Sequence, residues 1–187
     1  MDTKDKLLEE ALRLFAQRGV DAVGVQEIVE SAGVTKPTLY HHYGSKEGLV
    51  RAVVERGFAR LNAALDELGP YDRDLPWYLE RQAGLWIGCV RTQPAWFRVE
   101  LSLSFLPPDN PSAALVRPGL EALQSRFAAL FQEAATQHGN MRGRHKLLAA
   151  GWLGNLYHWT GIQLGWVEAD EALIRAGTRQ FLYGVFS

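Results

Sequence analysis

The spacing of the apolar residues constrains this chain more than any other feature, because it keeps the period of an α-helix along the sequence. Near the N-terminus, apolar side chains recur three and four residues apart, at Leu7, Leu8, Ala11, Leu12 and Phe15, which is the pattern of one helix face. No stretch shows the alternation of apolar and polar residues that a half-buried strand requires. We therefore expect an all-α fold.

Glycine and proline residues divide the sequence into about nine expected helices. In order, these cover about residues 3–18, 25–31, 36–43, 46–68, 75–93, 95–105, 110–138, 144–166 and 170–187. Thr3 and Ser45 are the expected caps of the first and the fourth helix. Asn110 and Pro111 should start the seventh, which Pro118 is expected to kink or restart. Three short helices followed by longer ones predict a small head on a larger C-terminal helical bundle.

Charge and cysteine content narrow the class of protein. The formal net charge is −1, so a case for nucleic-acid binding has to rest on local charge. Cys89 is the only cysteine and cannot form a disulfide within the chain, which suits a reducing compartment. The N-terminal residues MDTKDKLLEE lack the apolar core of a signal peptide. A cytoplasmic protein is expected.

Residues 147–167 carry no Asp, Glu, Lys or Arg and are numerous enough to span a bilayer. The stretch also holds Asn155, His158, Gln163 and four glycines. Burial within protein, between two subunits, explains it better than a membrane span.

No catalytic, metal or cofactor site is expected. The sequence has no phosphate-binding glycine loop, no GxSxG and no HExxH. Cys89 lies on an apolar helix face without a nearby base, as a buried structural cysteine does. His41 and His42 are adjacent, so on a helix they point apart and make a poor metal pair.

The segment from Gly33 to Leu49, GVTKPTLYHHYGSKEGL, carries the functional signal. Two short helices joined by a tight glycine-containing turn are the parts of a helix-turn-helix. The second opens with Thr35, Lys36, Pro37 and Thr38, and hydroxyl groups, a cation and free N–H groups at a helix N-terminus suit phosphates and base edges. Residues 31–46 include no acid. Leu39 and Tyr43, four residues apart, can anchor this helix to the core of the head.

With the first amphipathic helix before it, the sequence VQEIVESAGVTKPTLYHHYGSKEGLV resembles the N-terminal domain of TetR-type transcriptional regulators. The resemblance implies a helix-turn-helix DNA-binding domain over residues 1–46 and a ligand-sensing and dimerisation domain over residues 47–187. It also implies a homodimer that binds double-stranded operator DNA and that a small molecule releases, as in a repressor. A helical ligand-binding or interaction module without DNA binding is the alternative.

The resemblance places DNA contacts on eight residues: Gln26, Thr35, Lys36, Thr38, Tyr40, His41, His42 and Lys46. The alternatives are a core aromatic for Tyr40 and a solvated charge for Lys46, and Tyr43 is expected in the core. One position departs from the family pattern. Gly24 stands where the family has a Ser or Thr cap on the second helix, and it offers no side-chain oxygen.

The resemblance implies a small-molecule pocket in the C-terminal bundle, and an aromatic lining with few polar groups predicts a largely apolar ligand. The expected lining is Trp86, Trp96, Phe97, Phe127, Phe131 and Trp159, with Glu100 and Asn155 as polar anchors. For Glu100 the alternative is an ion pair with Arg81, Arg91 or Arg126.

Four glycines of the eighth expected helix, Gly151, Gly154, Gly161 and Gly165, fall within roughly 80° of one another on a helical wheel. Each costs about 1 kcal/mol relative to alanine, which close approach by another helix can offset. Trp152, Trp159 and Trp166 form a second stripe. The resemblance implies that the last two helices pair with their copies, and we add His158, Gly177 and Phe181 to this interface. Alternatively, the glycines accommodate bulky neighbours within one subunit.

Overall fold

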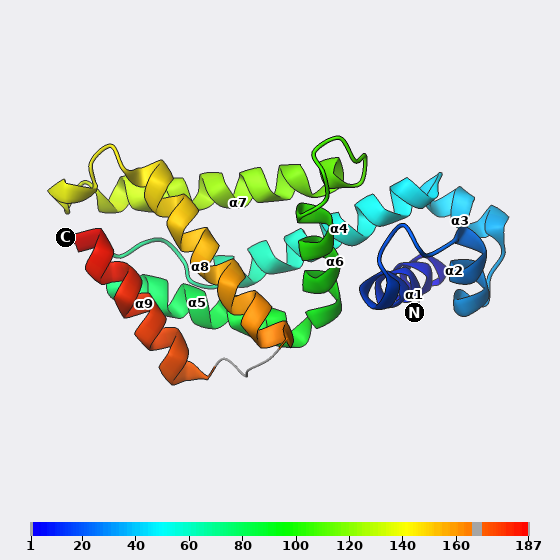
Figure 1. Ribbon diagram of the computed structural model, residues 1–187, viewed down its shortest axis with the longest axis horizontal. Coiled ribbons are helices and arrows are strands. Elements are labelled where there is room, and N and C mark those ends of the chain that lie inside the picture. Colours follow the sequence, from blue (N-terminus) through cyan, green and yellow to red (C-terminus); the bar gives the residue numbers. More distant parts are fainter. Residues whose placement is uncertain (1, 166–169, 187) are drawn as a thin grey trace. The chain divides into compact units, whose positions relative to one another are not determined.

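The computed structural model describes residues 2–165 and 170–186, and within them it contains nine α-helices, one short 3-10 helix and no strand (Figure 1). In chain order the helices are α1 (Thr3–Arg18), α2 (Val25–Ala32), α3 (Lys36–Tyr43), α4 (Lys46–Asp66), α5 (Leu75–Thr92), α6 (Pro94–Ser104), α7 (Ala113–Ala134), η1 (Gly139–Met141), α8 (His145–Gly165) and α9 (Glu171–Phe186). The prediction of an all-α fold is confirmed.

The helix ends follow the expected local signals with three exceptions. Ser45 does cap α4, since its hydroxyl accepts a hydrogen bond of 3.0 Å from the Gly48 N–H. The prediction for Thr3 is wrong by one residue, because Asp2 has the extended backbone of the cap and Thr3 is already helical. Helix α7 begins at Ala113 rather than at Pro111, because Asn110 holds a separate turn by accepting bonds from the N–H groups of Ser112 and Ala113. Nor does α7 restart at Pro118, which lies inside one continuous helix, and the kink expected as the other outcome stays a prediction.

The chain forms two compact units. The first, here called the head unit, comprises Met1–Arg60 and Gln93–Pro118; the second, the body unit, comprises Leu61–Thr92 and Gly119–Ser187. The division passes through α4 and α7, and it assigns α6 to the head unit. The functional boundary between residues 46 and 47 stays a prediction.

Helix α1 is central to the head unit and packs against α2, α3 and α6. Leu7, Ala11, Phe15 and Leu39 are fully or almost fully buried in this core. Elsewhere in the head unit, the indole of Trp96 on α6 lies against α4 at Gly57, where a Cβ would overlap the ring. Phe58 stacks edge-on against the same indole, at 5.1 Å between ring centroids.

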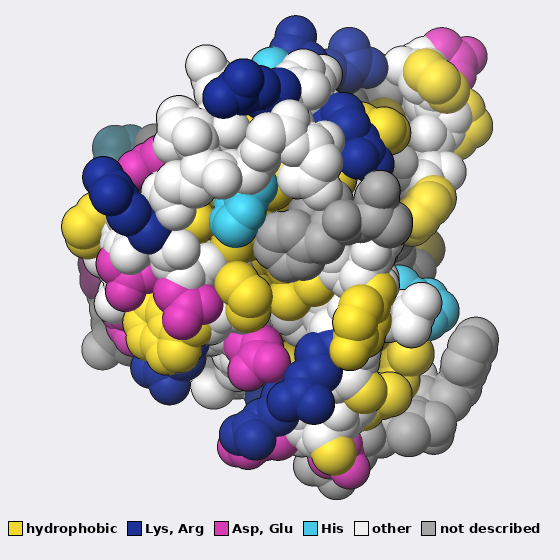
Figure 2. Space-filling view, turned by 90° about the vertical axis from the view of Figure 1, so that its left-hand side faces the viewer, with side chains coloured by type: hydrophobic (Ala, Val, Ile, Leu, Met, Phe, Trp, Pro, Cys, Tyr) yellow, Lys and Arg dark blue, Asp and Glu magenta, His cyan; other side chains and the backbone are white. Residues whose placement is uncertain are grey.

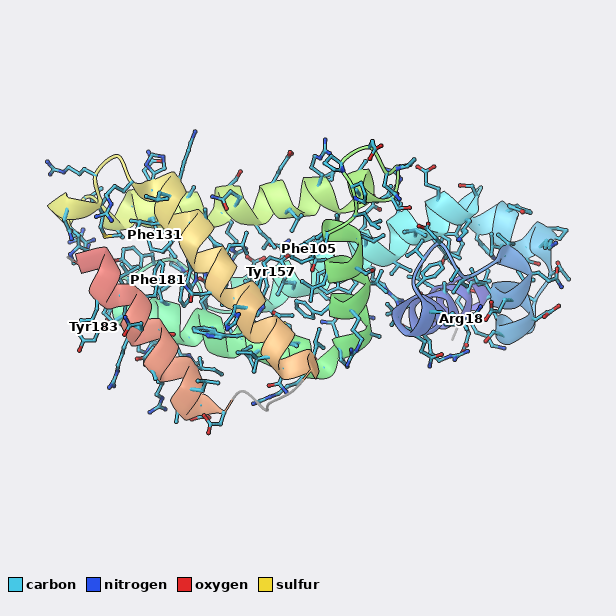
Figure 3. The ribbon with its side chains drawn as sticks, viewed as in Figure 1. Arg18, Phe105, Phe131, Tyr157, Phe181 and Tyr183 are labelled. Carbon is cyan, nitrogen blue, oxygen red and sulfur yellow. The ribbon has the colours of Figure 1, made fainter. Side chains whose placement is uncertain are left out.

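The body unit is built around α5, which packs against α8 and α9. Its core is rich in aromatic rings that also form hydrogen bonds: the Trp86 N–H donates to the Thr160 hydroxyl at 2.8 Å, and the Trp152 N–H donates to the Gln82 amide oxygen. Figure 3 shows Phe181 of α9 directed towards Phe131 of α7, and their ring centroids are 6.1 Å apart.

Helix α8 contains most of the uncharged stretch. Of the helices in residues 2–165 and 170–186, none is both long enough and apolar enough to cross a membrane.

Candidate nucleic-acid interface

The two helices and the turn predicted as a helix-turn-helix are present in the head unit. Helix α2 ends at Gly33, which has the left-handed backbone (φ 64°) that favours glycine at a helix C-terminus. Thr35 has an extended backbone and opens α3. Leu39 is completely buried, so it fixes α3 to the core of the head unit and leaves the other side of the helix to solvent.

All eight residues predicted to contact DNA are at least partly accessible. Five are exposed (Gln26, Thr35, Lys36, Tyr40 and His41), and three are half-buried (Thr38, His42 and Lys46). Tyr40 is 47% exposed although it is aromatic, so the reading of Tyr40 as a core residue is not supported. The accessible surface of α3 therefore combines a cation, hydroxyl groups, two imidazoles and a phenol with no acid from its own segment.

The N-termini of α2 and α3 have no side-chain cap. At α3 the Thr35 hydroxyl pairs instead with the Thr38 hydroxyl, at 3.0 Å between the oxygens. At α2 the cap position is Gly24. Since the first N–H groups of a helix and its dipole favour anions, both termini are suited to DNA phosphates.

Tyr43 supports α3 from within the head unit. It is half-buried, and its hydroxyl donates to the Lys4 carbonyl at 2.7 Å. Burial raises the pKa of this phenol above its ordinary value. These observations favour an anchoring role for Tyr43 over a DNA contact.

Hydrogen bonds and an ion pair join α1 to α2 and to α4 in the head unit. Sequence reasoning missed them. The Arg13 guanidinium donates to Ser31 at 2.9 Å, and the Ser31 hydroxyl donates to Glu10 at 2.7 Å. Arg56 of α4 forms an ion pair of 2.7 Å with Glu9 of α1. Their partners lie 18 to 47 residues away, so no local spacing in the sequence reveals them.

The residues predicted to bind a ligand are divided between the two units. Trp96, Phe97 and Glu100 lie on α6 in the head unit and are buried. The body unit contains the other predicted residues: Trp86, Phe127, Phe131, Asn155 and Trp159. A pocket formed by both sets stays a prediction.

Both predicted polar anchors have hydrogen-bonding partners on their own helices. Glu100 is completely buried and accepts a bond of 2.8 Å from the Ser104 hydroxyl. Asn155 is half-buried and donates to the Gly151 carbonyl at 3.0 Å. Of the arginines considered as partners of Glu100, Arg126 pairs with Asp66 at 2.6 Å, and Arg81 lies over the Trp77 ring at 5.9 Å.

The glycine face of α8 is open in the single chain. Gly151, Gly154, Gly161 and Gly165 are all exposed, and so is His158. A Cβ at Gly154, Gly161 or Gly165 would meet nothing within 4 Å, so crowding within one subunit does not explain these three glycines.

Two other predicted interface residues pack within the chain. A Cβ at Gly177 would overlap the Trp159 indole, and the Phe181 ring lies 5.1 Å from that of Trp152. Sequence reasoning missed Leu147, Leu173 and Tyr183, which are exposed apolar or aromatic residues of α8 and α9. Figure 3 shows Tyr183 pointing away from the body unit. Regular spacing along α9 could have identified Leu173 and Tyr183.

Cys89 is buried, and burial raises the pKa of its thiol. This environment favours a structural role over nucleophilic chemistry. Within the described part of the chain, no three His, Cys, Asp or Glu side chains are grouped so that they could hold a metal ion.

The profile of the bacterial regulatory proteins of the tetR family matches residues 7–53. Over 60 residues the chain is 42% identical to the transcriptional repressor ComR of Escherichia coli K12, which covers 32% of this chain and 29% of ComR. Over 100 residues it is 35% identical to the transcriptional repressor NemR of the same organism, covering 48% and 50% of the two chains. The chain thus matches no more than about half the length of these relatives.

Similarity of fold extends much further than similarity of sequence. A TetR-like transcriptional regulator from Rhodococcus sp. RHA1 superimposes with a TM-score of 0.76 at 21% identity, over 97% of this chain and 96% of that one. A transcriptional regulator from Aquifex aeolicus VF5 gives a TM-score of 0.74 at 20% identity, over 99% and 100%. Residues 7–53 thus resemble the N-terminal domain of the tetR family of bacterial regulatory proteins, and the chain as a whole shares its fold with solved TetR-like regulators.

Proposed function

We propose that the protein is a ligand-responsive DNA-binding transcriptional regulator, a cytoplasmic repressor that a small molecule releases from its operator. The observation that carries this proposal is the accessible, acid-free surface of α3, held in place by the buried Leu39. The names of the relatives support it, because ComR and NemR are both called transcriptional repressors.

In this proposal α3 lies in the major groove of the operator. Thr38, Tyr40 and the two histidines reach base edges or the backbone, while Lys36 and Lys46 pair with phosphates. The uncapped N-termini of α2 and α3 add backbone N–H groups for further phosphates.

A two-fold dimer would present two copies of α3 to successive turns of the duplex, roughly 34–36 Å apart or somewhat more. We propose that the exposed face of α8 and α9 forms this dimer. On α8 the face holds Leu147 and the four glycines, and on α9 it holds Leu173 and Tyr183. Apolar and small residues that stay exposed in one chain are what a subunit interface requires.

The effector is proposed to be a largely apolar small molecule that binds among the aromatic residues predicted for the pocket. Release requires that it bind the DNA-incompetent conformation more tightly, since equal affinity for both conformations shifts nothing. By linkage, operator DNA must then lower the affinity for the effector by the same factor.

The test is a fluorescence-anisotropy titration of DNA taken from beside the gene, at several salt concentrations. Lys36→Ala and Tyr40→Ala should each weaken binding, and Lys46→Ala should lower the salt slope by about one unit. Lys146→Ala, an exposed lysine of the body unit, is the matched control and should change nothing. Unchanged affinity in both α3 variants would instead favour a helical binding module that does not bind DNA.

The dimer has a separate test. Light scattering should show that Gly161→Leu dissociates it, because a leucine would separate the paired helices. Gly84→Leu, at an exposed glycine of α5 with free space around it, should leave the dimer intact. An intact dimer in the Gly161 variant would place the interface elsewhere.

A further inference from the structure

A groove on the head unit lies between α1 and α6, and none of the residues assigned to DNA lines it. Its volume is about 370 Å³, which falls in the lower part of the range of roughly 300–1,000 Å³ for small-molecule sites. The two helices pack against each other within the head unit (Figure 1). Space remains between them because the residues that line it at this point are short: Ala16 on α1, and Pro94 and Ala95 on α6.

The floor of the groove is apolar. Leu12 belongs to the apolar stripe of α1, but it is only half-buried, whereas Leu8, Ala11 and Phe15 are buried in the core. Together with Ala16 and Ala95, Leu12 presents a short hydrocarbon surface to solvent. Covering this surface with an aliphatic chain would be favourable, since apolar area would leave water.

Two arginines line the groove beside this floor, Arg13 from α1 and Arg98 from α6. Gln17 of α1 lines it as well. The one carboxylate of the lining, Glu9, already forms an ion pair of 2.7 Å with Arg56. Two guanidinium groups beside an apolar floor complement a molecule that joins an aliphatic chain to a carboxylate, because the planar arginine fork matches the two carboxylate oxygens.

We propose that this groove is a binding site for a small amphipathic carboxylate. Its chain lies along Leu12, Ala16 and Ala95, and its carboxylate pairs with Arg98 and Arg13. The site is distinct from the aromatic pocket of the proposed function, because none of the residues predicted for that pocket lines the groove.

Occupation of the groove would act on the helix-turn-helix through Arg13. This guanidinium also donates to Ser31 at the end of α2 and forms an ion pair with Glu10. A carboxylate that draws Arg13 towards the groove competes with these bonds. Only this regulatory consequence rests on the proposed function; binding itself does not.

The test is a calorimetric titration of the full-length protein with sodium octanoate, in the absence of DNA. Octylammonium and 1-octanol have the same chain and serve as probes without the carboxylate. Octanoate should bind, and the two other probes should bind at least tenfold more weakly. No octanoate binding, or equal binding of all three probes, would overturn the proposal.

Variants then locate the binding. Arg98→Gln should weaken octanoate binding roughly tenfold or more, because a charged hydrogen bond is lost. The matched control is Arg142→Gln, which removes an arginine from a hollow of about 570 Å³ at the turn between α7 and α8. Figure 2 views this end of the body unit and shows Lys and Arg side chains gathered along its upper edge. Octanoate affinity should not change in this control.

Ala16→Phe should abolish binding by filling the groove. Circular dichroism establishes whether this variant folds, and Ala95→Leu is the milder replacement if it does not. Undiminished binding by both Arg98→Gln and the folded groove-filling variant would place octanoate elsewhere and overturn the proposal.

Discussion

Trp86 and Trp152 of the body unit are held in a different way from Trp96 of the head unit. In the body unit, Trp86 and Trp152 each donate their N–H to a buried polar side chain. In the head unit, the Trp96 N–H is buried and has no hydrogen-bond acceptor within the described part of the chain. Its indole is held by shape, edge against Gly57 and face to edge with Phe58. Polar pairing therefore holds Trp86 and Trp152, whereas close contact with a glycine holds Trp96.

The largest effect is expected where this close contact is broken. Gly57→Ala should lower the free energy of unfolding by about 3 kcal/mol, because the new methyl group overlaps the Trp96 indole and the packing must shift. Gly84→Ala is the control: it lies in the exposed interior of α5 with nothing within 4 Å, so it should stabilise by about 0.5–1 kcal/mol. Urea unfolding of both variants measures the difference. Similar free energies of unfolding for the two variants would refute the hypothesis that close packing against Gly57 holds Trp96.

A second experiment compares the tryptophans themselves. Trp86→Phe removes ring area and also the donor to Thr160, whereas Trp96→Phe removes ring area alone. We expect the first substitution to cost about 1 kcal/mol more than the second. Thermal unfolding of the two single variants is the measurement. An equal or larger cost for Trp96→Phe would show that the Trp96 N–H has an acceptor in solution.

The smallest effect on stability is expected from a substitution in the exposed polar network of Glu10, Arg13 and Ser31 in the head unit. The Ser31 hydroxyl, and then the Arg13 guanidinium, hold the pKa of Glu10 below its ordinary value of 4.5. A lowered carboxylate pKa stabilises the fold above the ordinary value, and this contribution is lost as the pH falls through the folded-state value. Ser31→Ala should therefore cost no more than about 0.5 kcal/mol at pH 7.

The cost of Ser31→Ala in the free energy of unfolding should decrease as the pH is lowered below 4.5. Thr160→Val, in the buried network of the body unit, should cost more and show no such change between pH 3 and 7, because the Trp86–Thr160 pair does not titrate. Denaturation of both variants at a series of pH values tests this contrast. A pH-independent cost for Ser31→Ala would mean that Glu10 is not linked to the hydroxyl.

Local signals in the sequence were sufficient for much of the fold and for the DNA-facing helix. Gly33 and Ser45 mark helix ends through backbone geometry and capping, which depend on neighbouring residues only. Leu39 was identifiable as an anchor of α3 because Leu39 and Tyr43, four residues apart, share one face of the helix. The same reasoning placed the cap of α1 one residue too late, at Thr3 instead of Asp2. It placed the start of α7 two residues too early, at Pro111 instead of Ala113, because Asn110 holds a separate turn.

Contacts between distant segments could not be predicted in the same way. The assignment of α6 to the head unit depends on packing such as that between Trp96 and Gly57, 39 positions apart (96 minus 57). Gly177 was expected at a subunit interface, yet Trp159 of the same chain explains it. For the aromatic residues expected to line a pocket, apolar character alone does not distinguish a cavity wall from a packed core.

The burial of Cys89 has a practical consequence for spectroscopy. Because the only thiol of the chain is inaccessible and its pKa is raised, a cysteine introduced on the exposed Asp21 would be the first to react with a nitroxide reagent, and Cys89 need not be replaced. A two-fold dimer would then carry one spin label on each head unit, in the turn before α2. Pulsed electron paramagnetic resonance could report the distance between the two labels in the free protein, with DNA and with octanoate.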